Sequence, residues 1–183
     1  VPREHAIRGL GPVLLTVRSL EPTARFLTEV MGMRDAGRYA DPDLADREVA
    51  VFSMGPGGAA AEVHVVVRSD LPRAQQGFGG VHHAAFRVAD HAAQQEWLSH
   101  LQSLGVGNSG LVERYYFESL YFREPGGTLF ELATDGPGFS ADEDPLTLGE
   151  SLALPPFLEP HRAAIEAGLK PLPQAARKSG VAW

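Results

Sequence analysis

The chain contains no cysteine among its 183 residues. Disulfide bonds, thiolate metal sites and thiol nucleophiles are therefore excluded. No apolar run approaches the ~18 residues that a transmembrane helix needs, and the N-terminal residues lack a signal-peptide pattern. Lys and Arg are outnumbered, 16 against 23 Asp and Glu, which gives a formal net charge of −7 without any basic cluster. We therefore expect a cytoplasmic protein with neither a nucleic-acid nor a membrane partner.

The apolar fraction of 44% is enough to build a core, either as one domain or as two small modules that share it. Each half of the chain predicts a strand, then a helix, then two strands joined through a Pro-Gly-Gly turn. In the first half these segments are residues 10–17, 21–31, 49–54 and 61–67. In the second half they are residues 81–88, 92–104, 115–123 and 128–134.

The two halves therefore form an internal repeat. Val17 corresponds to Val88, 71 positions later, and Glu62 corresponds to Glu131, 69 positions later. We expect an α+β fold of two tandem β-α-β-β-β modules with curved mixed sheets, because a unit that cannot bury its own sheet face pairs with its neighbour. The predicted boundaries are 1–70 for the first module, 71–80 for a linker, 81–138 for the second module, and 139–183 for a Pro-rich tail with a short helix.

A histidine and a carboxylate in the second half suggest a metal site. His83 stands at the start of one predicted strand, and Glu131 lies inside another, just after the Pro-Gly-Gly turn. A buried Glu is costly unless a partner compensates its charge. A histidine and a carboxylate on neighbouring strands supply two of the three protein ligands of a mononuclear non-haem iron site. Side chains alternate across a strand, so only one of His82 and His83 faces such a site.

The second half also carries motifs that resemble a known family. The segments VHHAAFRVAD, RYYFESLYFREPGGTLFELATDGPGF and LPPFLEPHR together resemble the C-terminal half of bacterial hydroquinone ring-cleaving dioxygenases. Those enzymes belong to the vicinal-oxygen-chelate superfamily, with the glyoxalases and the drug-sequestering proteins. The resemblance implies a glyoxalase/dioxygenase-like fold and an Fe(II)-dependent extradiol-type dioxygenase, with Mn(II) or another divalent metal as the alternative. It implies hydroquinone- or catechol-type aromatics and O2 as substrates, and a role in aromatic compound degradation.

The resemblance also implies roles for four residues. His83 and Glu131 match the family's metal ligands, and the superfamily pattern favours His83 over His82. Tyr121 matches a tyrosine that lies near the metal, and Arg114 matches an arginine that lines the pocket. Taken alone, the two histidines are better explained as surface or core residues that hydrogen-bond to backbone carbonyls. The alternative for Glu131 is an edge-strand carboxylate that faces solvent, for Tyr121 a place in the core, and for Arg114 a place on the surface.

The third metal ligand is missing from the pattern. Pro12 occupies the position in the first module that corresponds to His83, and proline cannot bind a metal. In the resembled enzymes the remaining histidine comes from an additional N-terminal module. We therefore expect this chain to be the C-terminal half of a longer enzyme, or alternatively a naturally short paralogue that another subunit completes. We also expect a homo-oligomer. His64 is kept as a reserve ligand, and Glu62 is interpreted as structural or exposed.

Two other functions stay open at this point. One is a glyoxalase-like lyase or isomerase, which would use a divalent metal as a Lewis acid. The other is a metal-free protein of the same fold that binds a small molecule, such as a drug, between its modules. Metal content separates the binding protein from the two enzymes, and reaction with O2 separates the dioxygenase from the glyoxalase.

Overall fold

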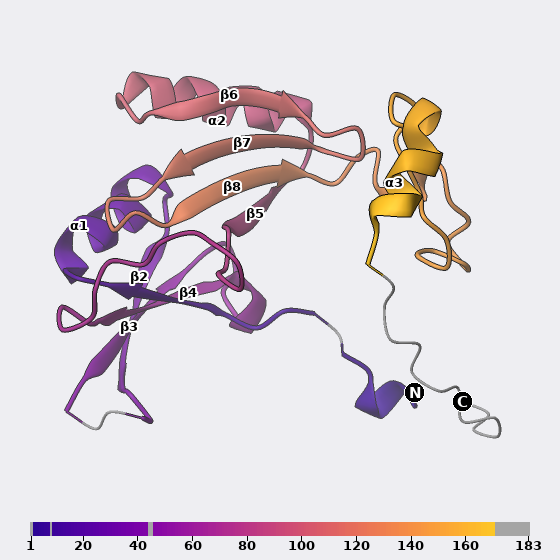
Figure 1. Cartoon of the computed structure of the whole chain (residues 1–183). Coiled ribbons are helices and arrows are strands. Elements are labelled where there is room, and N and C mark those ends of the chain that lie inside the picture. The colour runs from indigo at the N-terminus through magenta and orange to yellow at the C-terminus, as the bar shows by residue number, and fades with distance from the viewer. Residues whose placement is uncertain (1, 8, 44–45, 171–183) are drawn as a thin grey trace. The chain divides into compact units, whose positions relative to one another are not determined.

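The computed structural model describes residues 2–7, 9–43 and 46–170. Two compact units make up the chain (Figure 1). The larger unit, Gly9–Gly138, holds the repeated elements, and the smaller unit combines residues 2–7 with residues 139–170. The part of the predicted tail beyond residue 170 lies outside the described residues. Within the described residues, none of the helices has the length and apolar character that a membrane crossing demands.

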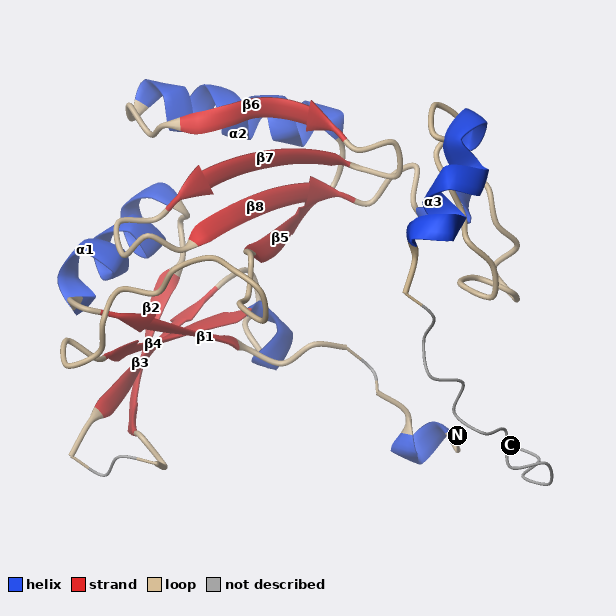
Figure 2. Ribbon diagram, viewed as in Figure 1, coloured by secondary structure: helices blue, strands red, loops and turns tan. Residues whose placement is uncertain are grey.

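The first module of the larger unit has one helix and one four-stranded sheet (Figure 2). Its elements are β1 (Val13–Val17), α1 (Leu20–Arg25), a π-helical turn η2 (Phe26–Val30), β2 (Arg34–Ala40), β3 (Glu48–Ser53), η3 (Ala59–Ala61) and β4 (Glu62–Val67). The strand order is β1-β4-β3-β2. β1 runs parallel to β4, and the other neighbours are antiparallel, so the sheet is mixed.

The second module repeats this arrangement. Its elements are β5 (Ala84–Val88), α2 (His91–Ser103), β6 (Asn108–Glu113), β7 (Glu118–Arg123) and β8 (Leu129–Thr134). The strand order is β5-β8-β7-β6, again with a parallel first pair and antiparallel neighbours. The predicted α+β fold of two tandem β-α-β-β-β modules with mixed sheets is therefore confirmed.

Local sequence signals explain where α2 begins and ends. The Asp90 carboxylate accepts a hydrogen bond of 2.9 Å from the Ala93 N–H, which satisfies a donor that the first helical turn leaves free. Gly105 follows the helix with a φ of 68°, a conformation that glycine adopts without strain. Leu101 is fully buried, whereas Leu104, which the pattern places on the apolar side, follows the helix and is 51% exposed.

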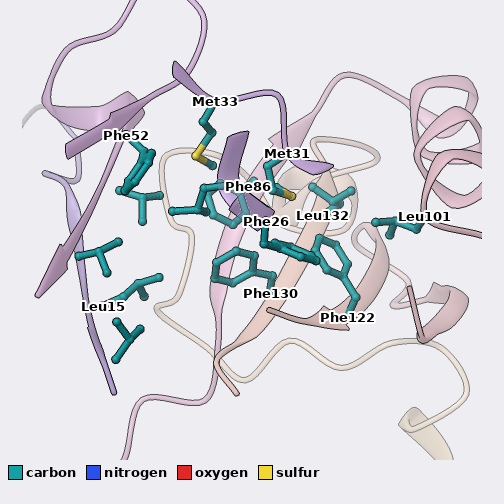
Figure 3. Close-up of a cluster of buried hydrophobic side chains, with 14 of the residues drawn as sticks. Leu15, Phe26, Met31, Met33, Phe52, Phe86, Leu101, Phe122, Phe130 and Leu132 are labelled. Carbon is teal, nitrogen blue, oxygen red and sulfur yellow. The ribbon is translucent and has the colours of Figure 1, made fainter. Parts of the chain in front are cut away.

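The two modules share one hydrophobic core. Phe26, at the junction of α1 and η2, meets Phe122 and Phe130 of the second module, with ring centroids 6.1 and 6.4 Å away (Figure 3). Phe130 and Leu132 are alternate residues of β8 that point into this core. Because side chains alternate along a strand, Glu131 between them projects from the opposite face of the sheet. This alternation places the carboxylate on the face that carries the candidate site.

A buried carboxylate ties the modules together at the Pro-Gly-Gly turn. Glu124 is 2% exposed, and its Oε2 accepts hydrogen bonds from the Thr23 hydroxyl of α1 at 2.8 Å and from the Gly126 N–H at 2.7 Å. Its Oε1 accepts a third bond from the Thr128 N–H at 2.9 Å. We call these four residues the inter-module latch. The latch holds the turn that leads directly into β8, the strand that carries Glu131.

Two strands and one turn differ from the sequence interpretation. The patterns missed β2, whose seven residues are all exposed and give no apolar alternation. They also missed β6, where Gly110 accompanies an irregularity in the pairing with β7. The predicted strand at 115–123 begins only at Glu118, because Tyr115 has a φ of 70° and the Arg114 N–H bonds the Phe117 carbonyl at 2.9 Å.

The strand pairing also corrects the alignment of the two repeats. β1 pairs Leu14 with His64, and β5 pairs Ala85 with Glu131. Leu14 and Ala85 are 71 positions apart, so His64, and not Glu62, occupies the position that corresponds to Glu131. The alignment by Glu62 is wrong by two residues, which keeps both side chains on the same face of the strand and leaves the apolar pattern unchanged.

The smaller unit consists of short helices. Its elements are η1 (Arg3–His5), η4 (Phe139–Ala141), η5 (Glu159–His161) and α3 (Arg162–Gly168). The Arg162 guanidinium contacts the Glu159 carboxylate at 2.6 Å, the Glu166 carboxylate at 3.2 Å and the Leu152 carbonyl at 3.0 Å. These contacts join η5 and α3 to the loop that contains Leu152.

Candidate functional site

His83 and Glu131 meet on the face of the second sheet that is turned away from the core. His83 lies immediately before β5, and its Nε2 is 2.7 Å from Oε2 of Glu131 on β8. The strand register explains the contact. Ala85 of β5 pairs with Glu131, and His83, two residues before Ala85, points to the same face of the sheet. The Glu131 side chain is 4% exposed and the His83 side chain 33% exposed. A buried carboxylate therefore faces a histidine that solvent and ligands can reach.

A third residue, which the sequence patterns did not identify, orients the carboxylate. The Ser119 hydroxyl of β7 donates a hydrogen bond of 2.5 Å to Oε1 of Glu131, and Ser119 is fully buried. Oε1 is thereby occupied and Oε2 is directed at His83. Hydrogen bonds of this kind hold a ligating carboxylate in place and fix which oxygen it offers. The available signal was strand alternation, which puts Ser119 and Tyr121 on the same face of β7.

Tyr121 and Arg114 form the next layer around this pair. Tyr121 is the direct cross-strand partner of Glu131, and its ring lies 6.0 Å from the His83 ring, centroid to centroid, in an edge-on arrangement. Arg114 Nη2 donates a hydrogen bond of 3.3 Å to the Tyr121 hydroxyl, and its guanidinium lies 5.6 Å from the centre of the tyrosine ring. The structure therefore brings all four predicted site residues together.

Hydrogen bonding and charge both act on Arg114. The hydrogen bond to Tyr121 raises the pKa of the Arg114 guanidinium above its ordinary value, and the negative charge of an ionised Tyr121 or of Glu131 acts in the same direction. Arg114 therefore supplies a permanent positive charge next to a phenolic oxygen. The backbone of Tyr121 is held as well, because its N–H donates to the Ser109 hydroxyl at 2.9 Å where the β6–β7 pairing is irregular.

His82 contacts the opposite edge of the His83 ring. The two Nδ1 atoms are 2.9 Å apart, so one of them must carry the proton and the other must accept it. A carboxylate only accepts, so a neutral His83 that donates Nε2–H to Glu131 accepts from His82 through Nδ1. The His82 carbonyl accepts a hydrogen bond of 2.7 Å from Gln76 in the linker. His82 thus supports the His83 ring and does not approach its Nε2 atom.

The reserve ligand His64 belongs to a different cluster. Its Nδ1 is 3.0 Å from the Tyr39 hydroxyl and its Nε2 is 3.1 Å from the Glu62 carboxylate, so both ring nitrogens are engaged within the first module. Glu62, interpreted from sequence as structural or exposed, has a half-buried side chain that pairs with this histidine. The residues that the structure describes contain no group of three His, Cys, Asp or Glu able to hold a metal ion.

The geometry of His83 and Glu131 fits two adjacent ligands of one metal ion. Nitrogen and oxygen ligands about 2.0–2.2 Å from an ion, and about a right angle apart, lie roughly 3 Å from each other. The 2.7 Å separation of Nε2 and Oε2 is close to that value. An imidazole and a carboxylate suit Fe(II) and related divalent ions. These two donors, with Tyr121 and Arg114 beside them, can position and polarise an acidic oxygen of a small ligand.

Comparison with known proteins identifies the family to which the chain belongs. Residues 9–132 match the Glyoxalase/Bleomycin resistance protein/Dioxygenase superfamily. A Bacillus subtilis (strain 168) protein named as a ring-cleaving dioxygenase, MhqA, is 51% identical over 94% of this chain and 54% of its own length. A chlorohydroquinone/hydroquinone 1,2-dioxygenase of Sphingobium indicum is 36% identical over 87% of this chain and 48% of its own length.

A crystal structure supports the same fold. A Bacillus subtilis protein described as a dioxygenase superimposes with a TM-score of 0.80 at 37% identity, covering 92% of this chain and 51% of that one. The chain thus spans about half the length of the curated relatives it matches. The repeated fold, the extent of the match and the identity to these relatives lead to one conclusion: the chain belongs to the glyoxalase/bleomycin resistance protein/dioxygenase superfamily.

Proposed function

We propose that this chain is the C-terminal, substrate-binding half of a metal-dependent ring-cleaving dioxygenase that acts on hydroquinone- or catechol-type aromatics with O2. The observation that carries the proposal is the contact between His83 and Glu131, an accessible imidazole against a buried, Ser119-oriented carboxylate. The names of the similar proteins, which include a hydroquinone dioxygenase, support the reaction class.

In this proposal His83 Nε2 and Glu131 Oε2 hold a divalent metal, Fe(II) or alternatively Mn(II). When bound, such an ion supplies coordination positions at which a phenolic oxygen and O2 come together. Ser119 keeps Glu131 fixed through Oε1, so that little side-chain freedom is lost on binding. With the metal on Nε2, His83 must carry its proton on Nδ1, and His82 Nδ1 then accepts it.

Tyr121 and Arg114 handle the substrate oxygen and its proton. The Tyr121 hydroxyl is positioned to exchange a proton with a phenolic hydroxyl placed near His83 and Glu131. Arg114 donates to the Tyr121 hydroxyl, and its permanent positive charge favours the ionised form of the substrate's phenolic group. Both residues thus promote binding of the substrate as a phenolate, the form that a metal prefers.

The third metal ligand is proposed to come from outside this chain. His82 contacts the wrong side of the His83 ring, and His64 is engaged with Tyr39 and Glu62. A further module of the kind that makes up the other half of the relatives, or a second subunit of a homo-oligomer, would supply the missing histidine. Loss of a supporting contact already costs ~10–100-fold in metal affinity, so the absence of a direct ligand costs at least as much.

The test compares this chain alone with the chain joined to the N-terminal half of the 51%-identical relative. Fe(II) binding is measured under anaerobic conditions, and O2 uptake is then followed with hydroquinone. We expect weak Fe(II) binding and no O2 uptake by the chain alone, and tight binding with substrate-dependent O2 uptake by the joined form. His83→Ala and Glu131→Gln in the joined form should abolish both.

His91→Ala is the matched control, because His91 also pairs with a carboxylate, Glu118, at 2.6 Å in the same module. It should leave metal binding intact. Equal loss of metal in His91→Ala, or none in His83→Ala, would contradict the assigned ligands. Metal binding without O2 uptake but with isomerase or lyase activity would point to the glyoxalase-like alternative. Aromatic binding without metal would point to the binding protein.

A further inference from the structure

A groove separate from the His83–Glu131 site lies between the helical segments of the two modules. It has a volume of about 410 Å³, which falls within the range of small-molecule sites. From the first module it is lined by the end of η2 and the turn after it, residues 29–32. From the second module it is lined by Ala93, Glu96, Trp97 and His100. These four residues follow the helical spacing of one face of α2, which borders the side that buries Leu101.

The charged side chains that line this groove are both carboxylates. Glu29 and Glu96 contribute carboxylates, and neither Lys nor Arg is among the described residues that line the groove. His100 Nε2 donates to the Val30 carbonyl at 2.9 Å, which leaves its Nδ1 as an acceptor in the neutral ring. A positively charged ligand therefore matches the groove, and an anion does not.

The carboxylates differ in availability. Glu29 is paired with Arg25, one helical turn earlier, at 3.3 Å. Glu96 is exposed and makes no ion pair with any residue that the structure describes. Glu96 is thus the charge that a ligand would use first, and Arg25 competes with the ligand for Glu29.

The apolar part of the groove suits an organic cation better than a metal ion. Trp97 is half-buried and packs edge-on against His100 with ring centroids 5.5 Å apart. Val30 and Ala93 add aliphatic surface beside it. An aromatic ring attracts a cation through its electron-rich face, and tryptophan does so most strongly. Carboxylates beside an indole ring are a suitable environment for an ammonium group that carries apolar substituents.

We propose that the groove between η2 and α2 binds a small organic cation with an apolar body, such as an alkylated ammonium compound. This site is independent of the proposed dioxygenase function. Because its walls come from both modules, a bound cation would bridge them. Trp97 would contact the substituted ammonium group, and Glu96 would neutralise its charge.

The test uses acetylcholine as a probe of charge and shape, and its uncharged carbon analogue 3,3-dimethylbutyl acetate as the comparison. Binding is followed on the indole ¹H–¹⁵N resonance of Trp97. The chain has two tryptophans, and a Trp97→Phe variant assigns the signal. We expect a saturable shift with acetylcholine, with a dissociation constant on the order of 1 mM, and no saturable shift with the neutral ester.

Substitutions at exposed positions make the test independent of folding. Glu96→Gln should weaken binding about 2- to 5-fold, and Arg25→Ala should strengthen it by a similar factor because it frees Glu29. Glu48→Gln, which removes the same charge from an ion pair on β3 outside the groove, should change nothing. Equal binding of the neutral ester, no saturable shift up to the solubility limit, or an unchanged affinity in Glu96→Gln would overturn the proposal.

Discussion

Replacement of Thr23 by valine tests whether the inter-module latch contributes to stability. Valine has nearly the same shape as threonine but cannot donate the 2.8 Å hydrogen bond to the buried Glu124 carboxylate. A hydrogen bond to a charged group contributes about 1.5–3 kcal/mol, and Thr23 is fully buried, so water cannot replace the lost donor. We expect the free energy of unfolding to fall by that amount, which corresponds to a Tm lower by about 3–12 °C for a chain of this size.

The measurement is urea denaturation of the full chain, followed by circular dichroism, for Thr23→Val, Thr23→Ser, Glu124→Gln and the double variant Thr23→Val/Glu124→Gln. Thr23→Ser keeps the hydroxyl and loses one methyl group, so it should cost only about 1 kcal/mol. In a Glu124→Gln background the cost of Thr23→Val should fall to about 0.5–1.5 kcal/mol, the value for a neutral hydrogen bond. If Thr23→Val unfolds at the wild-type urea concentration, or if Thr23→Ser loses as much as Thr23→Val, the latch does not stabilise the chain as argued.

Two other predictions concern the latch turn and a surface ion pair. Gly126→Ala places a Cβ 2.7 Å from Oε1 of Glu124, and three hydrogen bonds hold the carboxylate to which this oxygen belongs. The substitution should therefore destabilise the chain by about 1–3 kcal/mol, whereas Gly107→Ala, which meets open space, should not. Thermal denaturation compares the two variants. The hydrogen bond from Arg68 lowers the pKa of Asp70 below its ordinary value of 3.8. The stability that this ion pair contributes is therefore fully present above pH 3.8, and it is lost as the pH falls through the lowered pKa of the folded chain. An NMR titration should show a depressed Asp70 midpoint that rises towards 3.8 in Arg68→Gln; a midpoint unchanged by that substitution would disprove the role of Arg68.

Local signals in the sequence were sufficient for most of the elements. Six of the eight strands carry apolar alternation or an apolar run, and Asp90 and Gly105 mark the ends of α2. These signals act over a few residues, so they can be recognised without knowing the fold. β2 was missed because all of its residues are exposed at an edge of the sheet, where no apolar pattern is needed. β6 was missed because it opens with two polar residues and Gly110, where its pairing with β7 is irregular.

Other features depended on contacts between segments far apart in the chain. Apolar alternation has a period of two, so it could not decide whether Glu62 or His64 corresponds to Glu131. Only the pairing of β1 with β4 decided it. The inter-module latch likewise joins Thr23 to Glu124, which are 101 positions apart, and no local sequence pattern predicts that contact.

The same division holds for the site. The sequence by itself determined which residue types were present: a histidine opening one strand, a carboxylate within another, and the motifs that singled out His83, Glu131, Tyr121 and Arg114. Their roles in metal and substrate binding stay predictions. Tertiary structure alone decided that His83 meets Glu131 at 2.7 Å and that Ser119 occupies the second carboxylate oxygen. The physical reason is that side-chain alternation along one strand follows from covalent geometry, whereas the distance between side chains on three strands follows from the register of the sheet.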